Sequence, residues 1–130
     1  MVLNESDSKE ARSEVSDFLK KGYTLCTVDI ALAECLNVIW KHANLVKDLE
    51  PEELSLVVED LTSLYDGLSV TPTRELKDEA MQIAMSQNIT VYDALFIAAA
   101  QKLNASLFTA DKKLCVKTDK LIKSKLLTKE

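Results

Sequence analysis

The chain has 130 residues, of which 47% are apolar and 28% charged, and this composition predicts one globular domain over residues 1–130 and excludes a disordered chain. No apolar run approaches the roughly 20 residues of a membrane span, and the polar, acidic N-terminus predicts no signal peptide. The net charge of −5 divides into +5 over residues 112–130 and −10 over the rest, so a polyanionic partner would need bound cations or the basic tail to offset repulsion.

The chain alternates helical and strand-like segments. Helices are expected over residues 6–21, 30–44, 51–65, 74–87 and 91–103. Short strands are expected over residues 23–28, 68–71, 106–109 and 121–127, with a helical turn beginning at Asp111. Strands that alternate with helices in this way predict an α/β fold built on a parallel sheet.

The ends of these helices carry recognisable signals. Asp29 is expected to cap the helix after the first strand, and Pro51 suits the first position of the next helix. Glycine or asparagine follows several of the expected helices, where a left-handed residue commonly ends the helix; these are Gly22, Gly67, Asn88 and Asn104.

The cysteines and the histidine limit the possible chemistry. Three cysteines without C-x-x-C spacing argue against a disulfide framework and a thiolate zinc site, and favour a cytoplasmic protein. A single histidine, His42, argues against a multi-histidine metal site. Any metal would therefore be bound by carboxylates.

Three acids interrupt apolar segments. Glu34 lies within ALAECL, Asp93 lies in the first turn of the apolar helix expected from Val91, and Asp111 follows the strand expected at 106–109. The ends of parallel strands and the helix starts after them share one edge of a sheet, so we expect one pocket to hold all three acids. Clustered carboxylates repel each other unless a cation intervenes, and Mg²⁺ and Mn²⁺ prefer such oxygen ligands.

Each acid also has a structural explanation. Asp93 and Thr90 have the spacing of a capping box, and Asp111 is in a position to cap its own short helix. Glu34 could reach solvent and pair with Lys41, while Asn37, one turn after Glu34, could assist the site or only solvate that face. A receiver-like signalling domain also gathers acids, but it would need a lysine after a later strand, which no clear strand here supplies.

Three segments together resemble the PIN domain, in particular the VapC-type toxins of prokaryotic toxin–antitoxin pairs. They are LNESDSKEA (3–11), AECLNVIWK (33–41) and VYDALFIAAAQKLNASLFTADKKL (91–114). The resemblance implies an α/β/α sandwich around a parallel sheet and a metal-dependent endoribonuclease that cuts RNA. It further implies a homodimer or higher oligomer, inhibited by an antitoxin protein.

The resemblance also implies site residues. Glu34 matches the acid of the family's E-x-x-N motif, Asp93 the acid of YDA and Asp111 the acid of TAD, so all three would be ligands of Mg²⁺ or Mn²⁺ that position an attacking water. Thr109 matches a hydroxyl residue that flanks the site. The family's first strand and its aspartate have no counterpart in the sequence, and the resemblance places that strand between the segments matched by 23–28 and 106–109.

This difference leaves two functions open. The three retained acids favour a nuclease, whereas the unmatched strand and aspartate favour a catalytically impaired relative that acts as an interaction or antitoxin-binding module. A late start site, completion by a segment of another chain, and a degenerate relative would each account for it. In each case we expect unpaired strand edges and apolar helix faces to favour assembly into a dimer or higher oligomer.

Overall fold

The computed structural model describes residues 17, 20–22, 24–109 and 124–126, with residues 108, 109 and 124–126 as backbone only. The helix expected over residues 6–21 lies mostly outside these ranges, and Asp111 with its helical turn lies entirely outside them. Gly22, which follows that expected helix, has a φ of +83°, the left-handed conformation predicted for it.

The described strands form two parallel pairs. β1 (Cys26–Val28) pairs with β2 (Ser69–Thr71), and β3 (Leu107–Thr109) pairs with β4 (Ser124–Leu126). These pairings confirm the predicted parallel arrangement, although each strand is only three residues long. Within the described residues β1 and β3 are not hydrogen-bonded to each other.

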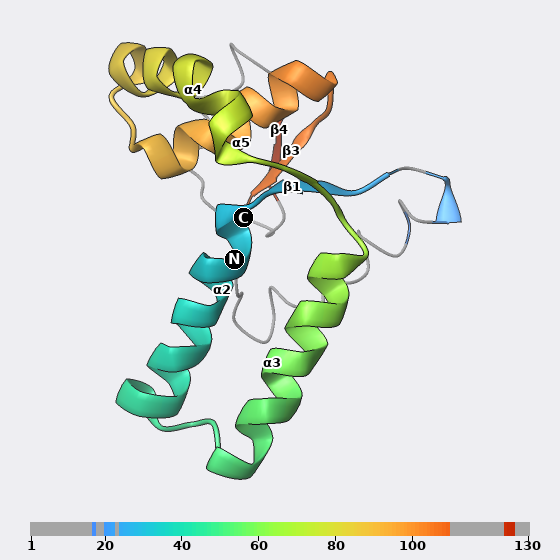
Figure 1. Ribbon diagram of the computed structural model, residues 1–130, viewed down its shortest axis with the longest axis vertical. Helices are drawn as coiled ribbons and strands as arrows, with labels where there is room; N and C mark the ends of the chain where they lie inside the picture. Colours follow the sequence, from blue (N-terminus) through green and yellow to red (C-terminus); the bar gives the residue numbers. More distant parts are fainter. Residues whose placement is uncertain (1–16, 18–19, 23, 110–123, 127–130) are drawn as a thin grey trace.

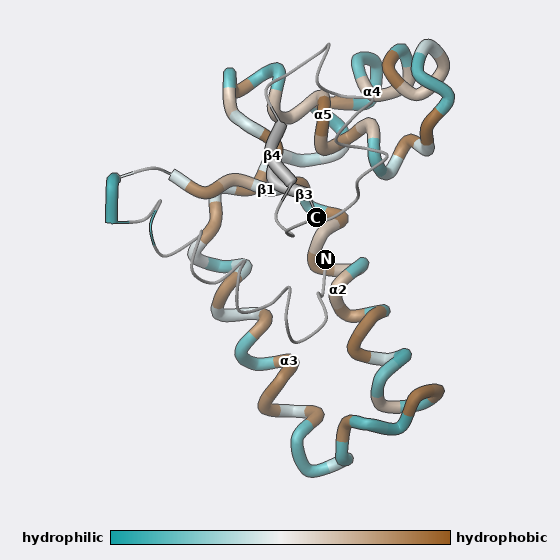
Figure 2. The backbone as a smooth tube through the Cα atoms, turned by 180° about the vertical axis from the view of Figure 1, so that it is seen from behind, coloured by the Kyte–Doolittle hydropathy of each residue, from teal (hydrophilic) through white to brown (hydrophobic). Residues whose placement is uncertain are grey.

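Two helices form an arm that projects away from the rest of the molecule (Figure 1). α2 (Ile30–Lys41) continues into a single π-helical segment, η1 (His42–Val46), and α3 (Pro51–Asp66) returns alongside α2. We call this unit, residues 30–66, the helical arm. Its hydropathy alternates along both helices, as Figure 2 shows from the opposite side.

The turn at the tip of the helical arm has local causes. Lys47 adopts a left-handed conformation, and the side chain of His42 bonds the carboxylate of Asp48 at 2.9 Å. α3 then begins at Pro51 as predicted, and the backbone N–H of Glu50 donates to the Glu53 carboxylate at 3.2 Å. α3 ends at Gly67, whose φ of −83° shows that this glycine does not use the left-handed conformation.

The other two described helices pack against each other. α4 (Thr73–Gln87) ends at Asn88 and α5 (Val91–Leu103) ends at Asn104, and both asparagines are left-handed, as predicted. Asn88 and Asn104 therefore stop the helices without a glycine. Among the described residues no single helix is both long and apolar enough to cross a membrane; α4 and α5 meet that criterion only as a pair bent by 118°.

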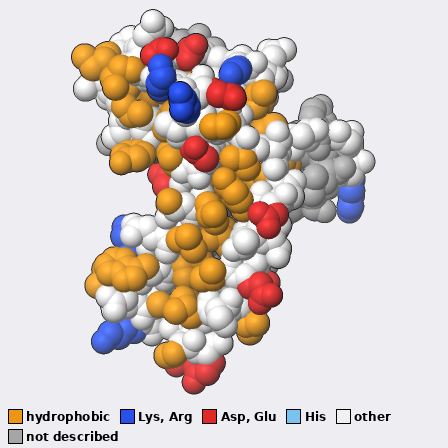
Figure 3. Space-filling view, in the orientation of Figure 1, with side chains coloured by type: hydrophobic (Ala, Val, Ile, Leu, Met, Phe, Trp, Pro, Cys, Tyr) orange, Lys and Arg blue, Asp and Glu red, His pale blue; other side chains and the backbone are white. Residues whose placement is uncertain are grey.

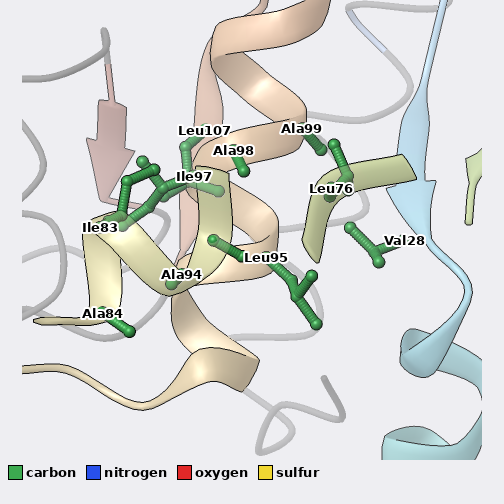
Figure 4. Close-up of a cluster of buried hydrophobic side chains, with 11 residues drawn as sticks. Val28, Leu76, Ile83, Ala84, Ala94, Leu95, Ile97, Ala98, Ala99 and Leu107 are labelled. Atoms are coloured by element: carbon green, nitrogen blue, oxygen red, sulfur yellow. The ribbon is translucent and has the colours of Figure 1, made fainter. Parts of the chain in front are cut away.

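The main hydrophobic core lies between α4, α5 and the strands (Figure 4). Its most completely buried large side chains are Val28, Leu76, Leu95 and Ile97. Alanines on both helices are also buried, which lets the two backbones approach closely; they are Ala80, Ala84, Ala94, Ala98 and Ala99. The apolar sequence of 91–103 is thus explained by burial, as expected.

Candidate active site

The β1–β2 pair ends at an edge from which two helices start. β1 ends at Val28, and α2 begins at Ile30; β2 ends at Thr71, and α4 begins at Thr73. Because the strands are parallel, both helix starts lie at the same, C-terminal edge. The backbone N–H of Asp29 donates to the carbonyl of Thr71 at 3.2 Å and so extends the pairing to this edge.

Asp29 connects the two helix starts through its side chain. Its carboxylate accepts a hydrogen bond from the backbone N–H of Thr73 at 2.9 Å and another from the Thr73 hydroxyl. Asp29 is the N-cap residue of α2, as predicted, but its side chain makes no capping hydrogen bond in that helix. Asp29 instead caps α4, whose own N-cap residue, Pro72, has no side-chain oxygen to offer.

The same contacts change the acidity of Asp29. The hydroxyl and then the N–H of Thr73 lower the pKa of the Asp29 carboxyl below its ordinary value, against a small opposing effect of burial. A lowered pKa in the folded state means that the ionised form stabilises the fold. That stabilisation is complete above the ordinary pKa of an aspartate and is lost as the pH falls through the lowered value.

We therefore expect Asp29→Asn to destabilise the fold at neutral pH by about 1 kcal/mol, as loss of a helix cap does. Urea unfolding at pH 7 and at progressively lower pH measures the free energy of unfolding of both proteins. The difference between them should shrink as Asp29 of the wild type becomes protonated in both its folded and its unfolded state. Asp78→Asn, which removes an exposed acid of α4, is the control and should show no such pH-dependent difference. Equal stability of Asp29→Asn and wild type at pH 7 would contradict the expectation.

Glu34 lies in the second turn of α2, and its side chain is exposed. The predicted exposure of this acid is confirmed, whereas it forms no ion pair with Lys41 among the described residues. Asn37 is also exposed, one turn further along the helix. Glu34 is thus available to bind a ligand.

Asp93 lies in the first turn of α5 and is half-buried. Its backbone N–H donates to the Thr90 hydroxyl at 3.1 Å, which confirms the predicted cap at this helix start. That bond uses the main chain of Asp93. A carboxylate in the first turn is also favoured by the helix dipole.

The other two predicted site residues can be located only in part. Thr109 is the last residue of β3, where its backbone alone is described, and Asp111 lies outside the described residues. Within the part of the chain that is described, no group of three or more His, Cys, Asp or Glu side chains is placed to hold a metal ion. The pocket of three acids, which includes Asp111, therefore stays a prediction.

The topology is compatible with that pocket. α2 starts at the C-terminal end of β1, and α5 contacts both β1 and β3. α5 joins β3 through a short connection at its far end, so the first turn of α5, with Asp93, belongs to the C-terminal end of β3. The order of the elements is therefore consistent with a shared edge for Glu34, Asp93 and the end of β3, which stays a prediction.

The link between Asp29 and Thr73 is the feature of this edge that sequence reasoning missed. The two residues are 44 positions apart, and no local pattern pairs them. One signal was present: Pro72 before α4 leaves the start of that helix without a local side-chain cap, so a partner from another segment was needed.

Comparison with known proteins places this arrangement in a family. The family model described as PIN domain matches residues 2–120. Ribonuclease VapC3 from Pyrobaculum aerophilum is 33% identical over 122 residues, which cover 94% of this chain and 89% of the relative. The crystal structure of PAE2754, also from Pyrobaculum aerophilum, matches with a TM-score of 0.65 at 23% identity, over 86% of this chain and 78% of that one. The latter likeness shows a shared fold.

Proposed function

The chain belongs to the PIN-domain family and is of the VapC type, and from this membership we propose that it is a metal-dependent endoribonuclease, the toxin of a toxin–antitoxin pair. The observation that carries the proposal is the likeness to a VapC ribonuclease along 94% of the chain. RNA in the cytoplasm is the proposed substrate. The α/β fold with parallel strands supports the same assignment.

The proposed cofactor is Mg²⁺ or Mn²⁺. Glu34 and Asp93 supply carboxylate oxygens, the donors that these hard cations prefer, and the exposed and half-buried positions of the two side chains suit a site open to substrate. Together with Asp111 they would hold the metal. When bound, such a cation activates water and stabilises negative charge on a phosphoryl group.

The protein's own residues have three proposed tasks. Glu34 and Asp93 would orient the cation and the water from two different helices. Thr109, the last residue of β3, would flank the site. The carboxylates also repel the phosphates of RNA, so a bound cation has to offset that repulsion. Besides the bound cation, the seven lysines within 112–130 carry positive charge that would attract RNA.

The proposal is tested by incubating the purified chain with a mixed-sequence RNA in Mn²⁺, in EDTA, and in EDTA followed by excess Mn²⁺. We expect internal cleavage in Mn²⁺, none in EDTA, and recovery when the metal is restored. Calorimetric titration with Mn²⁺ alone gives a second readout that does not depend on cleavage. Metal-independent cleavage, or neither cleavage nor Mn²⁺ binding, would contradict the proposed nuclease. The latter result would favour the alternative, a catalytically impaired interaction module.

The helical arm is the proposed contact surface for assembly. α3 has no buried residue, and large apolar side chains gather along the helical arm in the space-filling view (Figure 3). Those exposed by a third or more are Leu36, Trp40, Leu45, Val46, Leu54, Leu56 and Leu64. Such a patch exceeds the scattered apolar residues of an ordinary surface and is typical of an interface. We propose that it is covered in a homodimer or higher oligomer, and that the antitoxin is a further protein partner.

We expect the purified chain to be a dimer or higher oligomer by light scattering at micromolar concentration. The double substitution Leu56→Ser and Leu64→Ser should shift it towards monomer, because both side chains are about 60% exposed and their loss leaves the described core intact. Met85→Ser on α4, where the methionine is 78% exposed, is the control and should not change the mass. A cooperatively folded monomeric wild type would contradict the proposed assembly.

A further inference from the structure

The helical arm is joined to the rest of the molecule at a narrow junction. α2 packs extensively only against η1 and α3, and the described residues show no extensive contact of α2 with α4 or α5. In Figure 1 the helical arm accordingly points away from the α4–α5 pair. Among the described residues no extensive interface fixes the orientation of the helical arm relative to that pair; Ile30, the first residue of α2, packs against the core cluster, and the junction beside it supplies the other contacts.

Asp29 supplies the polar contacts of this junction. The residue lies between β1 and α2, and its carboxylate holds the Thr73 N–H at 2.9 Å as well as the Thr73 hydroxyl. Its own N–H bonds the carbonyl of Thr71 at 3.2 Å. Two hydrogen bonds thus tie the start of the helical arm to the start of α4, and a third ties it to the end of β2. The two bonds to α4 go to a charged acceptor, which makes them stronger than neutral ones.

The start of α4 is rigidly connected to α5. Leu76, one turn after Thr73, is 1% exposed, and it belongs to the same buried cluster as Ala80 of α4 and Leu95 and Ala98 of α5 (Figure 4). A close-packed cluster of this kind moves as a unit. The position of Thr73 therefore sets the position of α5, and with it the position of Asp93.

Glu34 lies on the other side of the junction, on α2, and its position is set by that helix. It follows Asp29 by five residues, about 7.5 Å along the axis of α2 at 1.5 Å per residue. A small rotation of α2 about the junction would displace Glu34 relative to Asp93 without disturbing the α4–α5 core. A site built from both acids needs that rotation to be restrained.

We propose that Asp29 is a positioning residue, whose bonds to Thr73 hold the helical arm that carries Glu34 against the helix pair that carries Asp93. The orienting role follows from the junction itself. The expected effect on RNA cleavage rests on the proposed function, because Glu34 and Asp93 act together only in that function.

Amide residual dipolar couplings measure the orientation directly, and the chain is small enough for them. The informative variants are Thr73→Val, which removes only the hydroxyl, and Asp29→Asn, which removes the charge. We expect the couplings of α2 to change relative to those of α5 in both variants, with the couplings within α4 and α5 unchanged. Thr73→Ser keeps the hydroxyl and should restore the wild-type orientation. Thr62→Val is the matched control, because the Thr62 hydroxyl bonds only the carbonyl of Val58 within α3.

Cleavage kinetics provide the second readout. If the proposed function holds, Thr73→Val and Asp29→Asn should lower kcat by about tenfold or more well below their melting temperatures, as small misplacements of catalytic groups do, while KM for RNA changes little. Wild-type orientation of α2 in both variants would overturn the positioning role, whatever the kinetics. An inactive wild type with altered α2 couplings in the variants would instead refute the proposed function and leave the positioning role supported.

Discussion

Asp93→Asn and Glu34→Gln should each reduce RNA cleavage by roughly 100-fold or more, the scale on which positioned catalytic groups contribute. Each change keeps the shape of the side chain and removes the negative charge that a divalent cation needs. The effect should be largest on kcat, because the lost interaction acts on the reacting phosphate. Initial rates at saturating Mn²⁺ measure it.

The fold of the Asp93→Asn variant should remain intact. The backbone N–H of residue 93, which donates to the Thr90 hydroxyl, is not altered by the substitution. Loss of a negative charge from the first turn of α5 costs about 0.3–1 kcal/mol, and relief of repulsion between neighbouring acids offsets it. Glu59→Gln, at an exposed acid of α3, is the control and should cleave RNA like wild type. An Asp93→Asn variant that retains more than about a third of the wild-type rate would contradict the assigned role, since a positioned group contributes far more than that.

Leu76→Ala should lower the free energy of unfolding by about 2–5 kcal/mol, the range for large-to-small changes in a packed core. Leu76 is 1% exposed at the centre of the cluster between α4, α5 and β1, where the neighbouring alanines offer little side chain to fill a cavity. Urea unfolding followed by circular dichroism measures the loss. Much of the 5–15 kcal/mol stability of a typical domain would then be gone.

The matched control lies on the same helix. Met85 is 78% exposed, so Met85→Ala should change the free energy of unfolding by no more than about 0.5 kcal/mol. If Leu76→Ala proved as mild as Met85→Ala, the described core would not be the part of the molecule that holds the fold together.

The helices were predictable because their signals are local. The apolar run of α5 and the asparagines that follow α4 and α5 gave the bounds of these helices to within a residue. Pro51 marked the start of α3 in the same way. β1, β2 and β3 were predicted at the right places but too long, because β-branched and apolar residues extend beyond the three residues that pair. β4 lies within the strand expected over residues 121–127, of which only 124–126 are described.

Two features of the fold were not predictable from the sequence. The expected helix over residues 30–44 changes to the π-helical η1 after Lys41, and the bond between His42 and Asp48 closes the turn that follows. Likewise Asp29 has the residue type of a local cap, and only the pairing of β1 with β2 brings it to Thr73. The first is a local contact between residues six positions apart, and only the second is a tertiary contact.

The residues of the candidate site were predictable from the sequence, whereas their relative positions were predictable only in part. Charge within an apolar run identified Glu34 and Asp93, and the structure places both on helices, one exposed and one half-buried. Their convergence on one edge stays a prediction. The distance between two acids on separate helices depends on how the helical arm is oriented, which no sequence pattern encodes. Asp111 lies outside the described residues, so its place in the pocket stays a prediction.

The most direct test of this site is paramagnetic broadening of amide signals by Mn²⁺. An ion held by both acids broadens nearby signals at substoichiometric concentration, so the second turn of α2, around Glu34, and the first turn of α5, around Asp93, should broaden together. Asp93→Asn should weaken both effects at the same Mn²⁺ concentration. Broadening around only one of the two residues, or centred on other acids such as Glu52 and Glu53 at the start of α3, would contradict a shared metal site and with it the proposed nuclease mechanism.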